Sequence, residues 1–250
     1  MAKTILITGA AQRVGLYCAL ALQGAGYQVV ATYRRDKPGL AQLRAAGVDC
    51  QFLAIEDDAH LTNDIAALSD YLHQTYGTLR AVIHNASSWQ GEEPVHGGLS
   101  EQLASDSQVF DAMMRIHAKT PYLLTRALQP LLQADGEQPA DVIAISDFAV
   151  NTGSCNHMAY AASKAALENL VFSLARMLAP HTKVNAIAPA LLMFNEGDDE
   201  HYKQHTLQKS LMGIEPGPAE VLHAIQYLLQ SRYVTGRVIA VDGGRHLKLP

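Results

Sequence analysis

Tyr160 and Lys164 are the residues of this sequence whose types and spacing best suit proton transfer. They stand four positions apart in the segment MAYAASK, which has a helical pattern, so both side chains lie on one face of a helix. A tyrosine hydroxyl supported by a lysine can act as a proton donor to a substrate. A surface pair on a helix, without a chemical role, is the alternative that this spacing alone leaves open.

A carboxylate, Asp147, stands thirteen positions before Tyr160, with Ser146 beside it. A serine hydroxyl is the usual group for steadying a carbonyl oxygen. A carboxylate instead accepts hydrogen bonds from N–H donors or, when protonated, passes a proton on. Asp147 therefore suits a nitrogen heterocycle better than a ketone. The alternative for Asp147 is a turn-former or helix cap after a strand.

The segment TGAAQRVG, residues 8–15, has the composition of a turn that binds a dinucleotide. It follows an apolar run and opens a helical pattern, where small residues such as Gly9 and Gly15 let the backbone approach a pyrophosphate. Val14 belongs to the same turn, and Arg13 stands where the dinucleotide fingerprint has a glycine. The Arg13 guanidinium could pair with phosphate oxygens, reach the substrate or face solvent. A tight turn without a ligand is the alternative for the whole segment.

The second strand candidate ends in TYRRD. About twenty residues beyond the glycine turn, chains that bind NAD carry an acid for the ribose 2′-OH. Here Tyr33, Arg34 and Arg35 occupy that region, and the acid comes only at Asp36. Arginine beside the 2′ position favours a 2′-phosphate, so we expect NADPH rather than NADH. The alternative is a solvated basic pair at a strand end.

The elements that must position these residues alternate along the chain. Strand candidates are near-continuous apolar runs, typical of strands buried on both faces of a parallel sheet. They are 3–8, 28–33, 50–55, 80–85, 141–146, 183–188 and 237–242. Helical patterns lie between them, at 13–25, 38–46, 60–76, 105–133, 157–179 and 218–231.

This alternation predicts an α/β fold: a single doubly wound Rossmann domain over residues 1–250, with a seven-stranded parallel sheet and helices on both faces. Two small domains are the alternative at this length. Ligands bind at the carboxyl ends of the strands in such a sheet. The loops at about 89–105 and 191–212 should therefore border the site.

The composition narrows the class of protein. The chain has 250 residues, 48% of them hydrophobic, and a net charge of −5, which excludes a nucleic-acid surface built on bulk charge. Its three scattered cysteines indicate reduced thiols, and no signal peptide or apolar run of membrane-spanning length is present, so we expect a soluble cytoplasmic protein. His201 and His205 are four apart, but the glutamate of a zinc motif is missing, so we expect no metal site.

The order and spacing of these motifs resemble the short-chain dehydrogenase/reductase family over nearly the whole chain. The resemblance rests on TGAAQRVG, on HNAS at 84–87, on Tyr160 with Lys164, on VNAIAP at 184–189 and on VTG and VDGG between 234 and 244.

Three departures from ordinary members resemble the pteridine reductase branch of that family. They are Arg13 in place of glycine, Asp147 in place of serine, and Ser87 in place of the glycine after the Asn-Ala pair. Trp89 is similar to the aromatic residue that this branch places over the pterin ring. A fourth departure is His117, where ordinary members have the asparagine of their catalytic tetrad.

The resemblance implies roles for specific residues. Asp147, Tyr160 and Lys164 would be catalytic, with Lys164 binding the nicotinamide ribose and lowering the Tyr160 pKa below its free value of about 10. The cofactor-binding residues would be Gly9, Arg13, Val14, Gly15, Tyr33, Arg34, Arg35, Asn85, Ala86, Ser146, Tyr160, Lys164 and Pro189. The residues that bind the substrate would be Arg13, Ser87, Trp89, Asp147 and Tyr160.

The function that the resemblance implies is NADPH-dependent reduction of a pterin. The segments FNEGDDEHY and VDGGRHLK are similar to the bacterial members of this branch that reduce 7,8-dihydromonapterin and, more weakly, dihydrofolate. Hydride would go to pterin C6 and a proton to N5, and the resemblance also implies a homotetramer. The alternatives are a carbonyl or 3-oxoacyl reductase of the same family and a non-catalytic regulator that binds NADPH.

Overall fold

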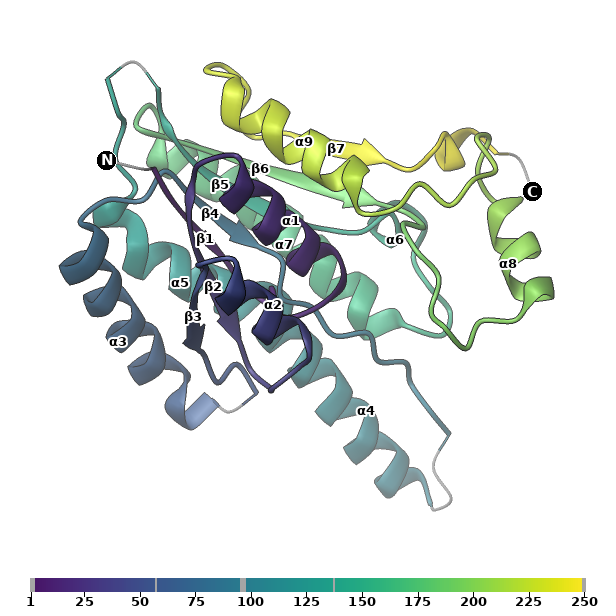
Figure 1. The fold of residues 1–250 in the computed structure, drawn as a ribbon. Coiled ribbons are helices and arrows are strands. Elements are labelled where there is room, and N and C mark those ends of the chain that lie inside the picture. Colours follow the sequence, from purple (N-terminus) through teal and green to yellow (C-terminus); the bar gives the residue numbers. More distant parts are fainter. Residues whose placement is uncertain (1–2, 57, 95–97, 137, 249–250) are drawn as a thin grey trace.

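A computed structural model describes residues 3–56, 58–94, 98–136 and 138–248. Seven strands form one sheet in the order β3-β2-β1-β4-β5-β6-β7, and all six neighbouring pairs are parallel (Figure 1). The strands are β1 (Thr4–Ile7), β2 (Gln28–Tyr33), β3 (Asp49–Phe52), β4 (Ala81–His84), β5 (Ala140–Ile145), β6 (Thr182–Pro189) and β7 (Val238–Val241). The predicted seven-stranded doubly wound α/β fold is confirmed.

Helices cover both faces of the sheet (Figure 1). On one face lie α1 (Arg13–Gly24), α2 (Gly39–Ala45) and α9 (Ala219–Gln230), and on the other lie α3 (Asp58–Tyr76), α4 (Leu99–Met114), α5 (Thr120–Leu128) and α7 (Met158–Leu178). The short α6 (Ala149–Thr152) and α8 (Glu200–Leu207) lie in the connections after β5 and β6.

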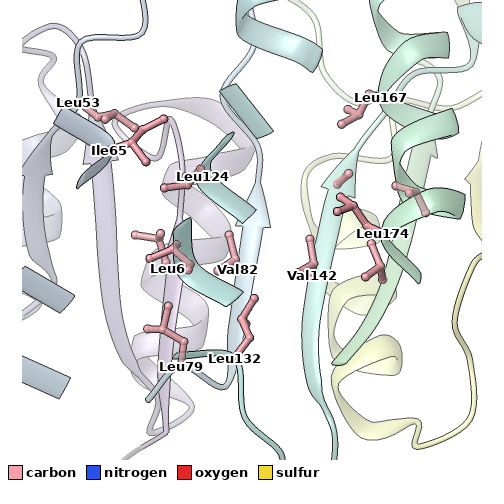
Figure 2. Close-up of a cluster of buried hydrophobic side chains, with 14 of the residues drawn as sticks. Leu6, Leu53, Ile65, Leu79, Val82, Leu124, Leu132, Val142, Leu167 and Leu174 are labelled. Atoms are coloured by element: carbon pink, nitrogen blue, oxygen red, sulfur yellow. The ribbon is translucent and has the colours of Figure 1, made fainter. Parts of the chain in front are cut away.

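Alternate residues of each central strand enter two separate hydrophobic cores. Leu6, Val82 and Val142 belong to the core under α3, α5 and α7, drawn in Figure 2 with Leu124, Leu167 and Leu174 of the helices. Their neighbours Ile5, Ile83 and Ile143 belong to the core under α1, α2 and α9. Because both faces of each strand are buried, the sequence shows continuous apolar runs instead of alternation.

The predicted helix 105–133 is helical over most of its length, but its bounds and its regularity differ from the prediction. The structure begins α4 at Leu99 and widens into a π-helix at Arg115–Lys119 before α5, with a 3-10 turn at Gln129–Leu131. Pro121 explains why the helix widens at this point. It has no N–H to donate, and its ring would clash with the carbonyl of His117 in a regular α-helix. A π-turn relieves that clash, and such turns are frequent at functional sites.

No helix in the described ranges is long and apolar enough to cross a membrane.

Candidate active site

Tyr160 and Asp147 meet at the carboxyl end of β5. Tyr160, buried on α7, donates its hydroxyl proton to Asp147 Oδ2 at 2.8 Å. The other carboxylate oxygen, Oδ1, accepts the N–H of Ala149 at 2.7 Å at the start of α6. Asp147 thus forms the turn after β5, which is one of the alternatives that the sequence left open. The same turn directs its second carboxylate oxygen toward the Tyr160 hydroxyl.

The charge environment of Tyr160 differs from the expectation. Burial, and then the charge of Asp147 and the hydrogen bond to it, raise the pKa of Tyr160 well above its ordinary value. The predicted lowering of this pKa by Lys164 is wrong for this arrangement, because burial of the hydroxyl and the adjacent Asp147 carboxylate both act in the opposite direction. Lys164 Nζ is 5.7 Å from the centre of the tyrosine ring. Asp147 therefore holds Tyr160 in its protonated, donating form.

Lys164 is buried one helical turn beyond Tyr160. Its Nζ donates to the carbonyl oxygen of Ile145 at 2.8 Å. Burial lowers the pKa of Lys164 to about 8, although the charges of Asp147 and Glu168 act in the opposite direction. Two of its three ammonium protons remain for other acceptors. Its predicted contact with the nicotinamide ribose stays a prediction.

Ser146 faces a partner that the sequence did not suggest. Its hydroxyl donates to Glu168 Oε1 at 2.6 Å, and its backbone N–H donates to Ile187. Burial is the largest cause that raises the pKa of Glu168, and the charge of Asp147 adds to it. Because the Ser146 hydroxyl proton is already committed, this hydroxyl could contact a cofactor only as a hydrogen-bond acceptor.

His117 lies behind Tyr160 in the π-helix and is 1% exposed. Its Nδ1 is 2.8 Å from Ser163 Oγ and its Nε2 is 2.8 Å from Ser87 Oγ. The ring stands edge-on to Tyr160 at 5.2 Å between centroids. Burial, followed by the charges of Lys164 and Arg34, lowers the pKa of His117 to about 2. The histidine is therefore neutral at neutral pH.

Trp89 stands over the same end of the sheet. Its ring lies 4.1 Å from His157 and 4.4 Å from Tyr160 between centroids, and 59% of the residue is exposed. The loop that carries it is fixed to α7 by Glu92, whose two carboxylate oxygens accept the N–H groups of Met158 and Ala159 at 3.0 and 2.8 Å. Trp89 is thus held beside the catalytic pair with a large part of its surface open.

The glycine turn after β1 is built for close backbone contact. Gly9 has φ of 66°, and a Cβ there would stand 2.6 Å from Ala86 Cα. A Cβ on Gly15 would stand 2.4 Å from Asn85 Nδ2. Asn85 closes the turn by donating from Nδ2 to the carbonyl oxygens of Thr8 and Gly9, both at 3.0 Å. Val14 lies half-buried in the same turn, against the core under α1.

Arg13 has a backbone that normally belongs to glycine. Its φ of 51° lies in the left-handed region, at the position where the dinucleotide fingerprint has glycine. Its guanidinium donates to Asn195 Oδ1 at 2.8 Å and to the Met193 carbonyl at 3.1 Å. Arg13 therefore ties the cofactor turn to the loop after β6. The predicted contacts with phosphate or substrate stay predictions.

The basic pair after β2 shares a carboxylate. Arg34 Nη1 and Arg35 Nη2 both pair with Glu56 Oε1, the second at 2.8 Å. Together with Tyr33 and Ser87, both arginines line a cavity that extends along the glycine turn. Because this cavity joins the turn to two guanidinium groups, its residues fit a dinucleotide with an anionic group near the adenosine ribose.

Pro189 ends β6 beside the site, and its carbonyl accepts the N–H of Phe148 at 2.9 Å. This bond links the segment after β5 to the start of the loop after β6. Asn185 lies deeper in the same strand, where its side chain bridges Val234 and Arg237, so it shapes the sheet rather than the site.

The structure thus brings together Ser87, Trp89, Asp147, Tyr160 and Lys164 at one edge of the sheet. Sequence reasoning missed four supporting residues, which are Glu56, Glu92, Ser163 and Glu168. No spacing rule marks them. Glu56 and Glu92 reach the site from other elements. Ser163 and Glu168 lie on α7 with Tyr160, but each bonds to a residue of another segment, His117 and Ser146 respectively. Of the described residues, no group of three or more His, Cys, Asp or Glu side chains is arranged to hold a metal ion.

Comparison with known proteins agrees with this geometry. Residues 9–246 match the family model described as enoyl-(acyl carrier protein) reductase. A solved structure from Burkholderia xenovorans, assigned to the short-chain dehydrogenases/reductases, superimposes with a TM-score of 0.81 at 27% identity and covers 99% of each chain. The chain belongs to the short-chain dehydrogenase/reductase family, and it is therefore an oxidoreductase with a nicotinamide cofactor.

Individual relatives narrow the resemblance further. The chain is 47% identical over 246 residues to a dihydromonapterin reductase of Klebsiella pneumoniae subsp. pneumoniae, with 98% of each chain covered. It is 44% identical over 244 residues to a dihydromonapterin reductase of Escherichia coli, covering 98% of this chain and 97% of that protein. The predicted resemblance to the pterin-reducing members of the family is confirmed.

Proposed function

We propose that this protein is an NADPH-dependent pterin reductase that converts 7,8-dihydromonapterin to tetrahydromonapterin. The observation that carries the proposal is the Asp147–Tyr160 hydrogen bond of 2.8 Å, next to the open ring of Trp89. A carboxylate at this place suits N–H and NH₂ groups, and an exposed indole suits a flat heterocycle. Relatives named dihydromonapterin reductase, 44 to 47% identical, support the substrate.

NADPH would lie along the glycine turn, with Gly9, Gly15, Asn85 and Ala86 at the pyrophosphate. Arg34 and Arg35 would meet the 2′-phosphate, with Tyr33 beside them. Lys164 would bind the nicotinamide ribose, and Ser146 and Pro189 would border the nicotinamide. When bound, the cofactor supplies the hydride, which we place on pterin C6.

The protein's own groups would supply the proton for N5. Tyr160 has the donating proton and lies beside the exposed face of Trp89. In the resting site Asp147 accepts the hydrogen bond of the Tyr160 hydroxyl, and it can also accept hydrogen bonds from the amino edge of the pterin. After Tyr160 has given up its proton, Asp147 could take up a proton from solvent and pass it to the tyrosine. Arg13, with Ser87 and Trp89, would complete the substrate contacts.

The loops at 89–105 and 191–212 would select the pterin side chain. In the first loop, Trp89 and Glu92 are positioned against α7, Leu99 already starts α4, and residues 95–97 lie outside the described residues. The second loop contains α8 and is tied to the cofactor turn through Arg13. Dihydrofolate has the same reacting ring with a bulkier tail, so we expect it to be a poorer substrate.

A homotetramer in the cytoplasm is the assembly and location that we propose. Several large apolar side chains on α4, α5 and α7 are exposed and could pack against a second subunit. They are Leu103, Phe110, Tyr122 and Phe172. The three cysteines, Cys18, Cys50 and Cys155, are free thiols, which suits a reducing compartment.

The test is NADPH oxidation by the purified protein, followed by absorbance, with 7,8-dihydromonapterin, dihydrofolate and a panel of ketones in parallel. The proposal predicts turnover with both pterins and a preference for dihydromonapterin. Turnover of ketones alone would identify a carbonyl reductase. Tight NADPH binding without oxidation of any substrate would identify a non-catalytic NADPH-binding protein.

A further inference from the structure

A row of hydrogen-bonded side chains runs behind Tyr160. Ser163 Oγ donates to the carbonyl oxygen of Tyr160 at 2.7 Å. The same oxygen lies 2.8 Å from His117 Nδ1, and His117 Nε2 lies 2.8 Å from Ser87 Oγ. Ser163 and His117 are 0% and 1% exposed, so water cannot replace any bond at this end of the row.

The direction of each bond follows from counting protons. A serine hydroxyl has one proton, and Ser163 gives its proton to the Tyr160 carbonyl. Ser163 Oγ must therefore accept from His117, which places the imidazole proton on Nδ1. Since burial keeps the pKa of His117 at about 2, the ring is neutral and Nε2 has no proton.

Nε2 then needs a donor, and two are in reach. The Ser88 N–H is 3.4 Å away, while the Ser87 hydroxyl is 2.8 Å away. The shorter contact makes Ser87 the principal donor. With its only proton turned toward His117, the Ser87 oxygen can act only as a hydrogen-bond acceptor toward the cavity that Ser87 lines.

We propose that His117 is a positioning residue that locks the Ser87 hydroxyl as a hydrogen-bond acceptor toward the substrate. The proposal rests on the proposed function. The Tyr160 proton is already held by Asp147, so Ser87 and Asp147 present two acceptors on the substrate side. The substrate edge that they recognise must be rich in N–H and NH₂ donors, which describes an aminopyrimidinone ring and not a ketone.

Such a lock also gives specificity. A site built to accept a hydrogen bond from a substrate N–H discriminates strongly against an analogue that lacks it, because the buried acceptor is left without a partner. A serine hydroxyl that could rotate would lose this discrimination, since it could donate as readily as accept. The role of His117 is to remove that freedom.

The first part of the test is nitrogen NMR of the protein labelled at histidine. The His117 signals are identified by their absence from the spectrum of the His117→Asn variant. The expected result is a proton on Nδ1 and an unprotonated Nε2 in the wild-type protein. A proton on Nε2 in the wild-type protein would overturn the proposal, and this measurement requires no substrate.

The second part uses Ser163→Ala, which leaves His117 and Ser87 in place and removes the acceptor for Nδ1. The expected result is transfer of the imidazole proton to Nε2 and a roughly tenfold rise in KM for dihydromonapterin, with a smaller change in kcat. Ser163→Thr keeps the hydroxyl and should restore both. Ser173→Ala, an exposed serine on the same helix, is the matched control.

The outcomes separate this proposal from the proposed function. If Ser163→Ala changes neither the tautomer nor the KM, the positioning role of His117 is wrong. If the wild-type protein has its proton on Nδ1 but turns over no pterin, the tautomer lock stands and the proposed function falls.

Discussion

His117→Asn should make the protein less sensitive to acid. The wild-type histidine cannot be protonated in the folded state, because burial and the charges of Lys164 and Arg34 lower its pKa to about 2. In the unfolded chain it has the ordinary value of 6.5. As the pH falls below 6.5, only the unfolded chain takes up this proton, so the stability of the folded state falls with pH.

The size of this stability loss depends almost entirely on the pKa of His117 in the unfolded chain. Since the folded pKa lies far below 5, protonation of the unfolded histidine alone should remove about 2 kcal/mol of stability between pH 7 and pH 5. His84, buried with a pKa lowered to about 4, contributes in the same direction in both proteins and cancels in the comparison. The wild-type protein should therefore lose about 2 kcal/mol more than the variant over this interval.

The assay is urea unfolding of both proteins at pH 7 and pH 5, at the same protein concentration throughout, so that assembly does not affect the comparison. Substitution of the exposed His201 by asparagine is the control for the loss of a histidine outside the core. Identical pH dependence in the wild-type protein and His117→Asn would refute the reasoning, since it would mean that the folded protein accepts the proton.

Three further substitutions test separate parts of the site. Asp147→Ala should lower kcat with dihydromonapterin on the order of 100-fold, measured by NADPH oxidation, and a loss under threefold would exclude it as part of the proton relay. Arg13→Gly should change the free energy of unfolding by no more than about 1 kcal/mol from the wild-type value, because relief of the strained left-handed backbone offsets the loss of two exposed hydrogen bonds. Limited proteolysis of the loop after β6 should become faster, since Arg13 no longer ties that loop to the cofactor turn. A loss of several kcal/mol would contradict this balance. Glu56→Gln should tighten NADPH binding roughly threefold and leave NADH binding unchanged in calorimetry, because the 2′-phosphate no longer competes with a carboxylate for Arg34 and Arg35. Weaker NADPH binding would instead show that Glu56 prepares the arginines for the phosphate.

The fold could be predicted from the sequence because each central strand has apolar residues on both of its faces. Ile5 and Leu6 show the cause directly, since these neighbours enter opposite cores and both are buried. The helix before β5 could not be predicted as it is. The π-helix around His117 depends on how one proline fits its preceding turn, and periodicity averages over such a local change.

The candidate site was predictable where its residues share a short segment, as Tyr160 and Lys164 do on α7. The prediction failed where the partner comes from elsewhere in the chain. Glu56 reaches the arginines after β2 from beyond β3, and Glu168 takes the hydroxyl proton of Ser146. The predicted sign of the Tyr160 pKa shift was also wrong, because it depends first on the burial of the hydroxyl and then on its contact with Asp147, and sequence spacing gives neither.

The measurement that tests the central claim most directly is transfer of deuterium from NADPH labelled at nicotinamide C4 to 7,8-dihydromonapterin. The proposed function predicts tetrahydromonapterin with deuterium at C6, detected by NMR of the product. It also predicts that Asp147→Ala slows the transfer without moving the label. Absence of labelled tetrahydropterin, while the same labelled cofactor delivers deuterium to a ketone, would contradict the assignment of this protein as a pterin reductase.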